Sequence, residues 1–128
     1  MIEELIALAA LKDRIDIKRA EQKYFEDDWI IGELLSEIQE VKEEIRPDNQ
    51  AFLEDELGDI LWGWLVLVQK LKSKGFVSSH EAIIRRALKK YSQRIGALKG
   101  DENDDQRWAE VKAEQKEVLE AEQGSMGN

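Results

Sequence analysis

The chain has 128 residues, of which 42% are hydrophobic and 37% are charged, and its net charge is −9 at pH 7. This composition is typical of one soluble globular domain and excludes an intrinsically disordered chain. The negative charge argues against nucleic acid or an anionic membrane as the main partner, and the absence of cysteine excludes disulfides and thiol chemistry.

The start of the chain, Met1 to Glu4, is acidic where a signal peptide would be basic. The longest apolar run, residues 60–68, has about half the length that a bilayer crossing needs. We therefore expect a cytoplasmic protein that makes no membrane contact.

Long helices are predicted along the chain, because eight glycines and one proline leave few breaks. Apolar residues at helical spacing predict a moderately amphipathic helix over residues 2–24 and a second helix over residues 28–46. Pro47 ends the second helix. A third helix, capped by Asp48 or Asn49, then runs to about residue 74.

The last part of the chain predicts two more helices. The fourth begins near residue 79 and carries a basic face of Arg85, Arg86, Lys89, Lys90 and Arg94. After a polar loop over residues 96–105, a mostly charged fifth helix runs to about residue 122. We expect residues 1–123 to form one all-α domain, an antiparallel bundle of four to five helices, and residues 124–128 to form a disordered tail.

The third predicted helix is apolar nearly all round between Ile60 and Val68, a pattern typical of helices buried on every side. One small bundle can hardly bury such a helix, so we expect a homodimer or homotetramer. Gly58 and Gly63 lie in the same helix, where each costs about 1 kcal/mol relative to alanine. Close backbone approach by another helix or by a ligand would explain them, and the alternative is that neither glycine matters.

Two pairs of acids flank the break at Pro47, Glu37 with Glu40 and Glu56 with Asp59. Within each pair two residues separate the acids, so both side chains share one face of a helix. The short break makes the two helices antiparallel. At ~1.5 Å rise per residue the pairs then fall at matching heights, about 8 and about 11 residues from the turn. We therefore predict that the four carboxylates converge.

Converging carboxylates repel one another, and desolvation adds to the cost unless cations neutralise them. Mg²⁺, with Mn²⁺ as an alternative, prefers oxygen ligands and commonly serves phosphate chemistry when carboxylates hold it. The competing interpretation is a solvated acidic surface, since acids are frequent throughout this chain. Two pairs at matching heights favour the metal site.

These acids also carry a resemblance to a known family. The runs Glu37-Ile-Gln-Glu40 and Glu56-Leu-Gly-Asp59 resemble the two-part acidic signature of the MazG-type all-α nucleoside triphosphate pyrophosphohydrolases. Later runs, Lys90 to Arg94 and Trp108 to Lys116, resemble that family's Lys, Arg and Trp positions. The similarity spans about residues 33–117, and the acidic pairs are its specific part.

The resemblance implies Mg²⁺-dependent cleavage of a nucleoside triphosphate between its α and β phosphates, which yields the monophosphate and pyrophosphate. A non-canonical nucleotide is one possible substrate. The resemblance further implies that Lys90 and Arg94 bind the phosphate tail, although a solvated helix surface is the alternative for this basic face. It implies that one of the first acid pair acts as general base and that all four acids hold the metal: Glu37, Glu40, Glu56 and Asp59.

The chain departs from the family pattern at three places. The family often has a Trp well upstream of the first acid pair, which has no counterpart here because Trp29 lies too close to that pair. Ser36 stands where the family often has a glutamate, which leaves the general base unassigned. Residues 95–97 replace a His-Pro-His segment, which indicates a divergent branch with its own nucleotide preference. Two alternatives stay open: a hydrolase of the dUTPase, dCTPase or phosphoribosyl-ATP pyrophosphatase type, and a catalytically silent helical oligomerisation module. Intact acid pairs argue against the silent module.

Aromatic residues offer a base-binding surface. Tyr24, Phe25 and Trp29 precede the acidic helix and either stack on a nucleobase or pack in the core. For Trp62 and Trp64 we favour packing in the core or at a subunit interface. His80 is the only histidine, and its place at a helix start favours a capping or solvent-exposed role over metal ligation.

Overall fold

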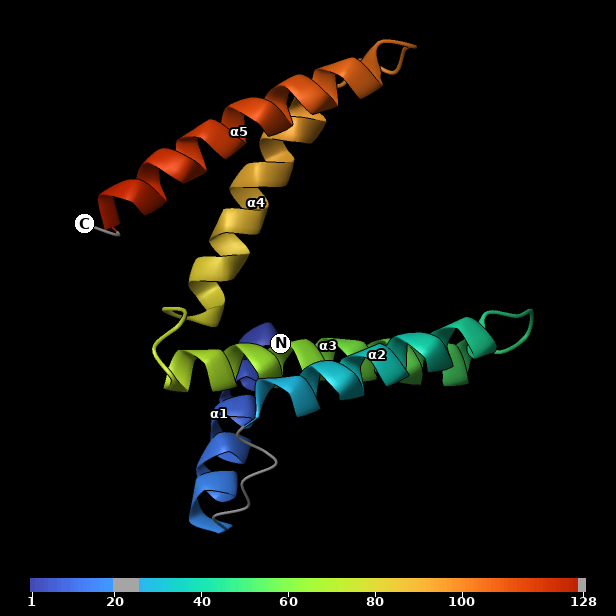
Figure 1. Ribbon diagram of the computed structural model, residues 1–128. Coiled ribbons are helices and arrows are strands. Elements are labelled where there is room, and N and C mark those ends of the chain that lie inside the picture. The colour runs from blue at the N-terminus through green and yellow to red at the C-terminus, as the bar shows by residue number, and fades with distance from the viewer. Residues whose placement is uncertain (20–25, 127–128) are drawn as a thin grey trace. The chain divides into compact units, whose positions relative to one another are not determined.

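The computed structural model describes residues 1–19 and 26–126, and the regular structure in this part is all helical. The helices are α1 (Ile2–Arg19), α2 (Asp27–Glu44), α3 (Gln50–Ser73), α4 (His80–Gly96) and α5 (Asp104–Met126) (Figure 1). The all-α fold predicted from the sequence is confirmed. None of the helices described is both long and apolar enough to cross a membrane.

The chain groups into two compact units, Met1–His80 and Glu81–Asn128. The sequence predicts a single domain over residues 1–123. It also predicts a tail from Gly124, whereas α5 continues to Met126. Tyr24, Phe25 and the last two residues lie outside the described part of the chain.

In the first unit, α2 and α3 form an antiparallel hairpin and make the most extensive helix pairing (Figure 1). Asp48 in the turn has a φ of 56°, in the left-handed region that aspartate tolerates better than most residues. Asn49 precedes α3 and is buried, but its side chain does not cap that helix. Its Nδ2 instead donates to the backbone carbonyl oxygen of Glu44 at 2.9 Å, across the turn. This bond ties the end of α2 to the start of α3.

Helix α1 packs against α3 through Ala9 and two aspartates, Asp13 and Asp16. Lys70 on α3 donates from Nζ to Asp13 at 2.7 Å, and this lysine is only 3% exposed. Apolar side chains of α1 such as Ile15 stay exposed. The buried face of α1 is therefore polar in its second half, which is why the apolar pattern weakens there.

His80 closes the first unit and is buried, with 1% exposure. Its Nε2 lies 2.8 Å from the carbonyl oxygen of Leu65, and its ring meets Trp64 edge to face with centroids 6.0 Å apart. The predicted solvent-exposed or capping role is therefore wrong, because α3 offers an apolar wall and a backbone acceptor. Trp64 packs as predicted.

The two glycines of α3 differ in their surroundings. A Cβ built on Gly63 would lie 2.5 Å from Cδ2 of Leu34, so α2 approaches α3 closely there. A Cβ on Gly58 would meet nothing within 4 Å. The structure thus shows a close approach at Gly63, although by the side chain of Leu34 and not by the backbone that the sequence predicts, while nothing in the described residues of the first unit requires glycine at position 58.

This contrast gives a matched pair of variants. Gly58→Ala should stabilise the protein by about 1 kcal/mol, the helix-propensity gain of alanine over glycine. Gly63→Ala should gain the same propensity but lose about 1–3 kcal/mol to overpacking against Leu34, so its net effect is neutral or destabilising. Urea unfolding midpoints measure both. Equal stabilisation in the two variants would contradict the close packing at Gly63.

Candidate metal centre

The predicted carboxylates converge between α2 and α3. Glu37, Glu56 and Asp59 each present an oxygen, and these three oxygens lie within 4.8 Å of one another. Glu40 adjoins this set, since its carboxyl contacts both Glu37 and Glu56 and acts on their ionisation. The structure thus brings together all four acids of the two pairs, three of them tightly.

Burial and mutual repulsion disfavour the ionised forms of these acids. Partial burial, together with contact with the Glu40 carboxyl, raises the pKa of Glu56 to about 7. The pKa of Glu37 is also raised, first by burial and then by the negative charges of Glu40 and Asp59. Raised carboxyl pKa values in a cluster are typical of sites that either share protons or bind cations.

Two oxygens in this cluster have no protein partner. Within the part of the chain that the structure describes, Oε2 of Glu37 and Oε2 of Glu56 are the buried side-chain polar atoms that lack a hydrogen bond. Buried polar atoms are nearly always satisfied, so such an oxygen calls for a partner. Carboxylate oxygens at this spacing are the ligands of hard divalent cations. The residues present therefore fit a divalent metal ion.

The pKa of Glu56 makes cation binding dependent on pH. A cation binds the ionised carboxylate, so affinity should rise as pH increases through about 7, and binding near that pH should release protons. Isothermal titration calorimetry of Mg²⁺ at pH ~7 in two buffers of different ionisation enthalpy measures the protons released. Glu56→Gln should lose most of this release. Binding without proton release in the unmodified protein would contradict the raised pKa.

The stability of the metal-free protein should depend on pH in the opposite direction to its cation affinity. Between the ordinary value of 4.5 and about 7, the folded state binds a proton at Glu56 that the unfolded chain has lost. The free energy of unfolding should therefore fall as pH rises through this window. Chemical denaturation at both ends of the window, in chelator, tests the sign.

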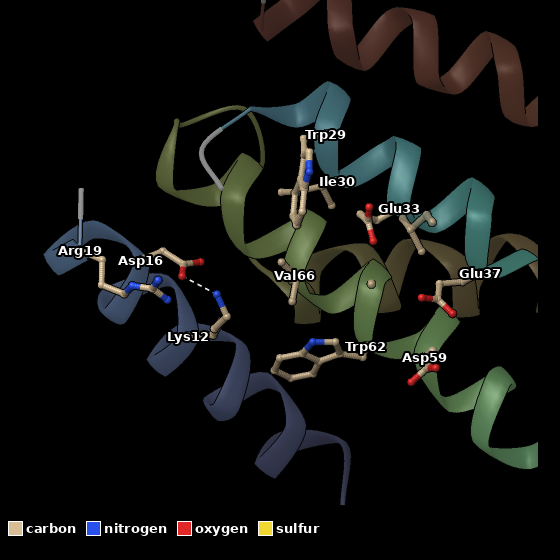
Figure 2. Close-up of a pocket in the computed structure, with 12 residues that line it drawn as sticks. Lys12, Asp16, Arg19, Trp29, Ile30, Glu33, Glu37, Asp59, Trp62 and Val66 are labelled. Atoms are coloured by element: carbon tan, nitrogen blue, oxygen red, sulfur yellow. Dashed lines mark hydrogen bonds and ion pairs between the residues drawn. The ribbon is translucent and has the colours of Figure 1, made fainter. Parts of the chain in front are cut away.

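A pocket of about 400 Å³ opens beside the acid cluster and is formed by α1, α2 and α3 (Figure 2). Glu37 and Asp59 line it at one end. Trp29, predicted to bind substrate, lines its wall from α2, and Trp62 lines it from α3. The packing role favoured for Trp62 is therefore incomplete, because its indole also faces this pocket.

Sequence reasoning missed the contribution of α1. Lys12, Asp16 and Arg19 line the same pocket, and Figure 2 shows them at the end away from Glu37 and Asp59. A signal was present, because residues 12, 16 and 19 follow the i, i+4, i+7 spacing of one helical face. Polar residues at that spacing normally indicate a solvated face, so only the packing of α1 on α3 distinguishes them.

Lys90 and Arg94, predicted to bind phosphate, lie on α4 in the second unit. Arg94 is buried, and its guanidinium lies 5.3 Å from the ring centroid of Trp108 on α5. Its Nε donates to Oε1 of Gln115 at 2.8 Å. Lys90 is exposed, with its Nζ 5.7 Å from the ring centroid of Tyr91. Arg94 thus holds α4 and α5 together.

The predicted basic face of α4 is partly paired within the second unit. Arg86 forms an ion pair with Glu122 on α5, which raises the pKa of the arginine through the hydrogen bond and the opposite charge. Together with Arg94, this pair connects the two helices, because no residue of α5 is buried in an apolar core.

The helical hairpin and its acids define an all-α protein with a carboxylate site suited to divalent cations and a pocket beside it. A family model, the MazG nucleotide pyrophosphohydrolase domain, matches residues 25–97, more than half of the 128-residue chain. The chain therefore belongs to the MazG family and is a hydrolase that acts on anhydride bonds of nucleotides. No curated protein and no solved structure matches it.

Proposed function

We propose that the protein hydrolyses a nucleoside triphosphate between its α and β phosphates, with Mg²⁺ as the cation, to give the monophosphate and pyrophosphate. The observation that carries this proposal is the convergence of Glu37, Glu56 and Asp59, two of them with a buried oxygen that lacks a partner, beside a pocket lined by two indoles. A silent scaffold would gain nothing from carboxylates held in this costly arrangement.

The four acids have two roles in this proposal, metal binding and proton acceptance. Glu37, Glu40, Glu56 and Asp59 hold the cation, which when bound neutralises charge on the phosphates and makes nearby water more acidic. Glu37 or Glu40 accepts the proton of the attacking water, and the raised pKa of Glu37 makes its carboxylate a stronger base than an ordinary glutamate. Water adds to the α phosphorus, and pyrophosphate leaves with the electrons of the broken anhydride bond.

Binding groups outside the acid cluster complete the proposal. Trp29 offers an aromatic face to the base, since it lines the pocket and is only partly covered. Lys90 and Arg94 remain proposed contacts of the phosphate tail, Arg94 as a fork and Lys90 as a point charge.

One assay tests the reaction. The protein is incubated with Mg²⁺ and a panel of canonical, deoxy and modified triphosphates, and the monophosphate, pyrophosphate and orthophosphate are quantified. We expect equal amounts of monophosphate and pyrophosphate. Release of orthophosphate alone would place cleavage at the wrong bond, and no turnover across the panel would refute the proposal.

We further propose that the protein acts as a homodimer or homotetramer. Apolar side chains remain exposed on several described helices, for example Leu35 on α2 at 62% and Phe52 on α3 at 67%. In the second unit the same holds for Leu88 and Ile95 on α4. Exposed apolar surface of this extent marks protein interfaces. Light scattering during gel filtration should give two or four times the 14.8 kDa of one chain, and a monomer would contradict this.

A further inference from the structure

The pocket has a polar end that the proposed reaction does not use. Lys12 and Asp16 of α1 line that end, and α1 lies outside residues 25–97, which match the family model. Asp16 is 4% exposed, and its carboxylate forms an ion pair with Lys12. A buried carboxylate beside an ammonium group is costly to desolvate, so it calls for an explanation beyond packing.

The residues that line the pocket are arranged in an order that fits a nucleotide. Figure 2 shows Glu37 and Asp59 at one end, Lys12 and Asp16 at the other, and Val66 between them. The two indoles, Trp29 from α2 and Trp62 from α3, lie on opposite sides of this middle part (Figure 2). If the cation site receives the phosphates, the indoles meet the base and α1 meets the edge of the base.

We propose that the Lys12–Asp16 pair of α1 reads the edge of the nucleobase and selects bases that carry a carbonyl next to a ring N–H. This inference rests on the proposed function, because it assumes that the phosphates lie at the acid cluster. It adds a specificity-determining pair from a helix that the family match does not include.

The chemistry of the two side chains sets the preferred base. An ammonium group only donates hydrogen bonds and an ionised carboxylate only accepts them. The Lys12 amine therefore suits a carbonyl oxygen, and the Asp16 carboxylate suits the adjacent N–H. Guanine adds an amino group beside its ring N–H, so the carboxylate accepts two parallel bonds, as it does from arginine. In the orientation that guanine takes, adenine and cytosine place an amino group against the Lys12 ammonium and a bare ring nitrogen against the Asp16 carboxylate, so a donor meets a donor and an acceptor meets an acceptor.

Substrate competition tests the inference. Values of kcat/KM are measured for GTP, UTP, ATP and CTP with the unmodified protein, with Asp16→Asn and with Lys12→Met. We expect GTP to lead in the unmodified protein. Each variant should lower the ratio of GTP to ATP by at least about 10-fold, the cost of one buried polar group left unpaired. Lys18→Met, an exposed lysine on the same helix, should leave the ratio unchanged.

Other outcomes have distinct meanings. A variant that slows all four triphosphates equally would make α1 a phosphate-binding or purely structural element and would overturn the inference. Asp16→Asn replaces the buried charge with a neutral amide of the same shape, so it should fold even if Lys12→Met, which leaves the buried Asp16 carboxylate without its ion pair, does not. Thermal unfolding by circular dichroism verifies folding of each variant.

A second readout does not depend on turnover. Guanosine and adenosine, which have no phosphate, are titrated against the protein in chelator while tryptophan fluorescence is followed. Guanosine should bind more tightly than adenosine, and Lys12→Met should remove the difference. If no triphosphate is hydrolysed but this preference holds, the proposed reaction fails and the inference stands. Equal binding of the two nucleosides would overturn the inference even in an active enzyme.

Discussion

Asp59→Asn should reduce Mg²⁺-dependent hydrolysis by at least about 100-fold. Loss of a residue that only supports a metal ligand already costs up to about 100-fold, and Asp59 is proposed as a ligand itself. The asparagine keeps the shape of the side chain and one oxygen but removes the charge that attracts the cation. Because Asp59 also repels Glu37 and Glu56, removing its charge should leave the metal-free fold as stable as before or more stable. Initial rates and thermal unfolding in chelator measure the two effects.

A loss of activity together with unchanged or higher stability separates a functional acid from a structural one. Glu40→Gln should behave in the same direction, since its carboxyl contacts Glu37 and Glu56. Glu54→Gln is the matched control, because Glu54 lies on α3, is exposed and accepts a hydrogen bond from Gln50. Full activity in both Asp59→Asn and Glu40→Gln would show that the reaction occurs elsewhere.

Lys70→Ala should destabilise the first unit by about 3–5 kcal/mol, the cost of leaving one member of a buried ion pair unpaired. Lys70 and Asp13 are both nearly inaccessible, and Ser73 donates a second bond to Asp13 at 2.7 Å. Denaturant unfolding measures the change. Lys72→Ala, on an exposed lysine of the same helix, should change stability by less than about 0.5 kcal/mol.

The Lys70–Asp13 ion pair also predicts that the stability of the protein falls at acidic pH. Burial alone would raise the pKa of Asp13, but the hydrogen bonds from Lys70 and Ser73 outweigh burial and lower this pKa below its ordinary value of 3.8. The folded state therefore binds fewer protons than the unfolded chain at low pH. The stabilisation is complete above that ordinary value and is lost as pH falls through the lowered pKa. Lys70→Ala should lack this acid-sensitive part, and an unchanged acid transition would contradict the pairing.

The acid cluster could be predicted from the sequence because each step was local. Two acids three positions apart share a helix face, Pro47 ends the first helix, and the short break makes the next helix fold back on it. Glu37 and Asp59 therefore had to come together once both helices formed. No longer-range information was needed for this part of the site.

The α1 side of the pocket could not be predicted in the same way. Asp13 is a charged residue that the sequence places on a solvated face, and its burial depends on Lys70 and Ser73, which lie 57 and 60 residues away in the chain. The burial of His80 could not be predicted for a similar reason, since the carbonyl oxygen of Leu65 that contacts it belongs to another helix. Charges and polar rings become core residues only when a distant partner satisfies them.

The hairpin of α2 and α3 also restricts which insertions and deletions this protein can accept. One residue added to α3 between Asn49 and Glu56 would rotate the second acid pair by about 100° and move it by about 1.5 Å relative to the first. A residue added to the turn between Glu44 and Asn49 changes neither helix, although it strains the bond between those two residues. Length variation among functional variants should therefore collect in the turn, and changes within either helix should occur only as compensated pairs.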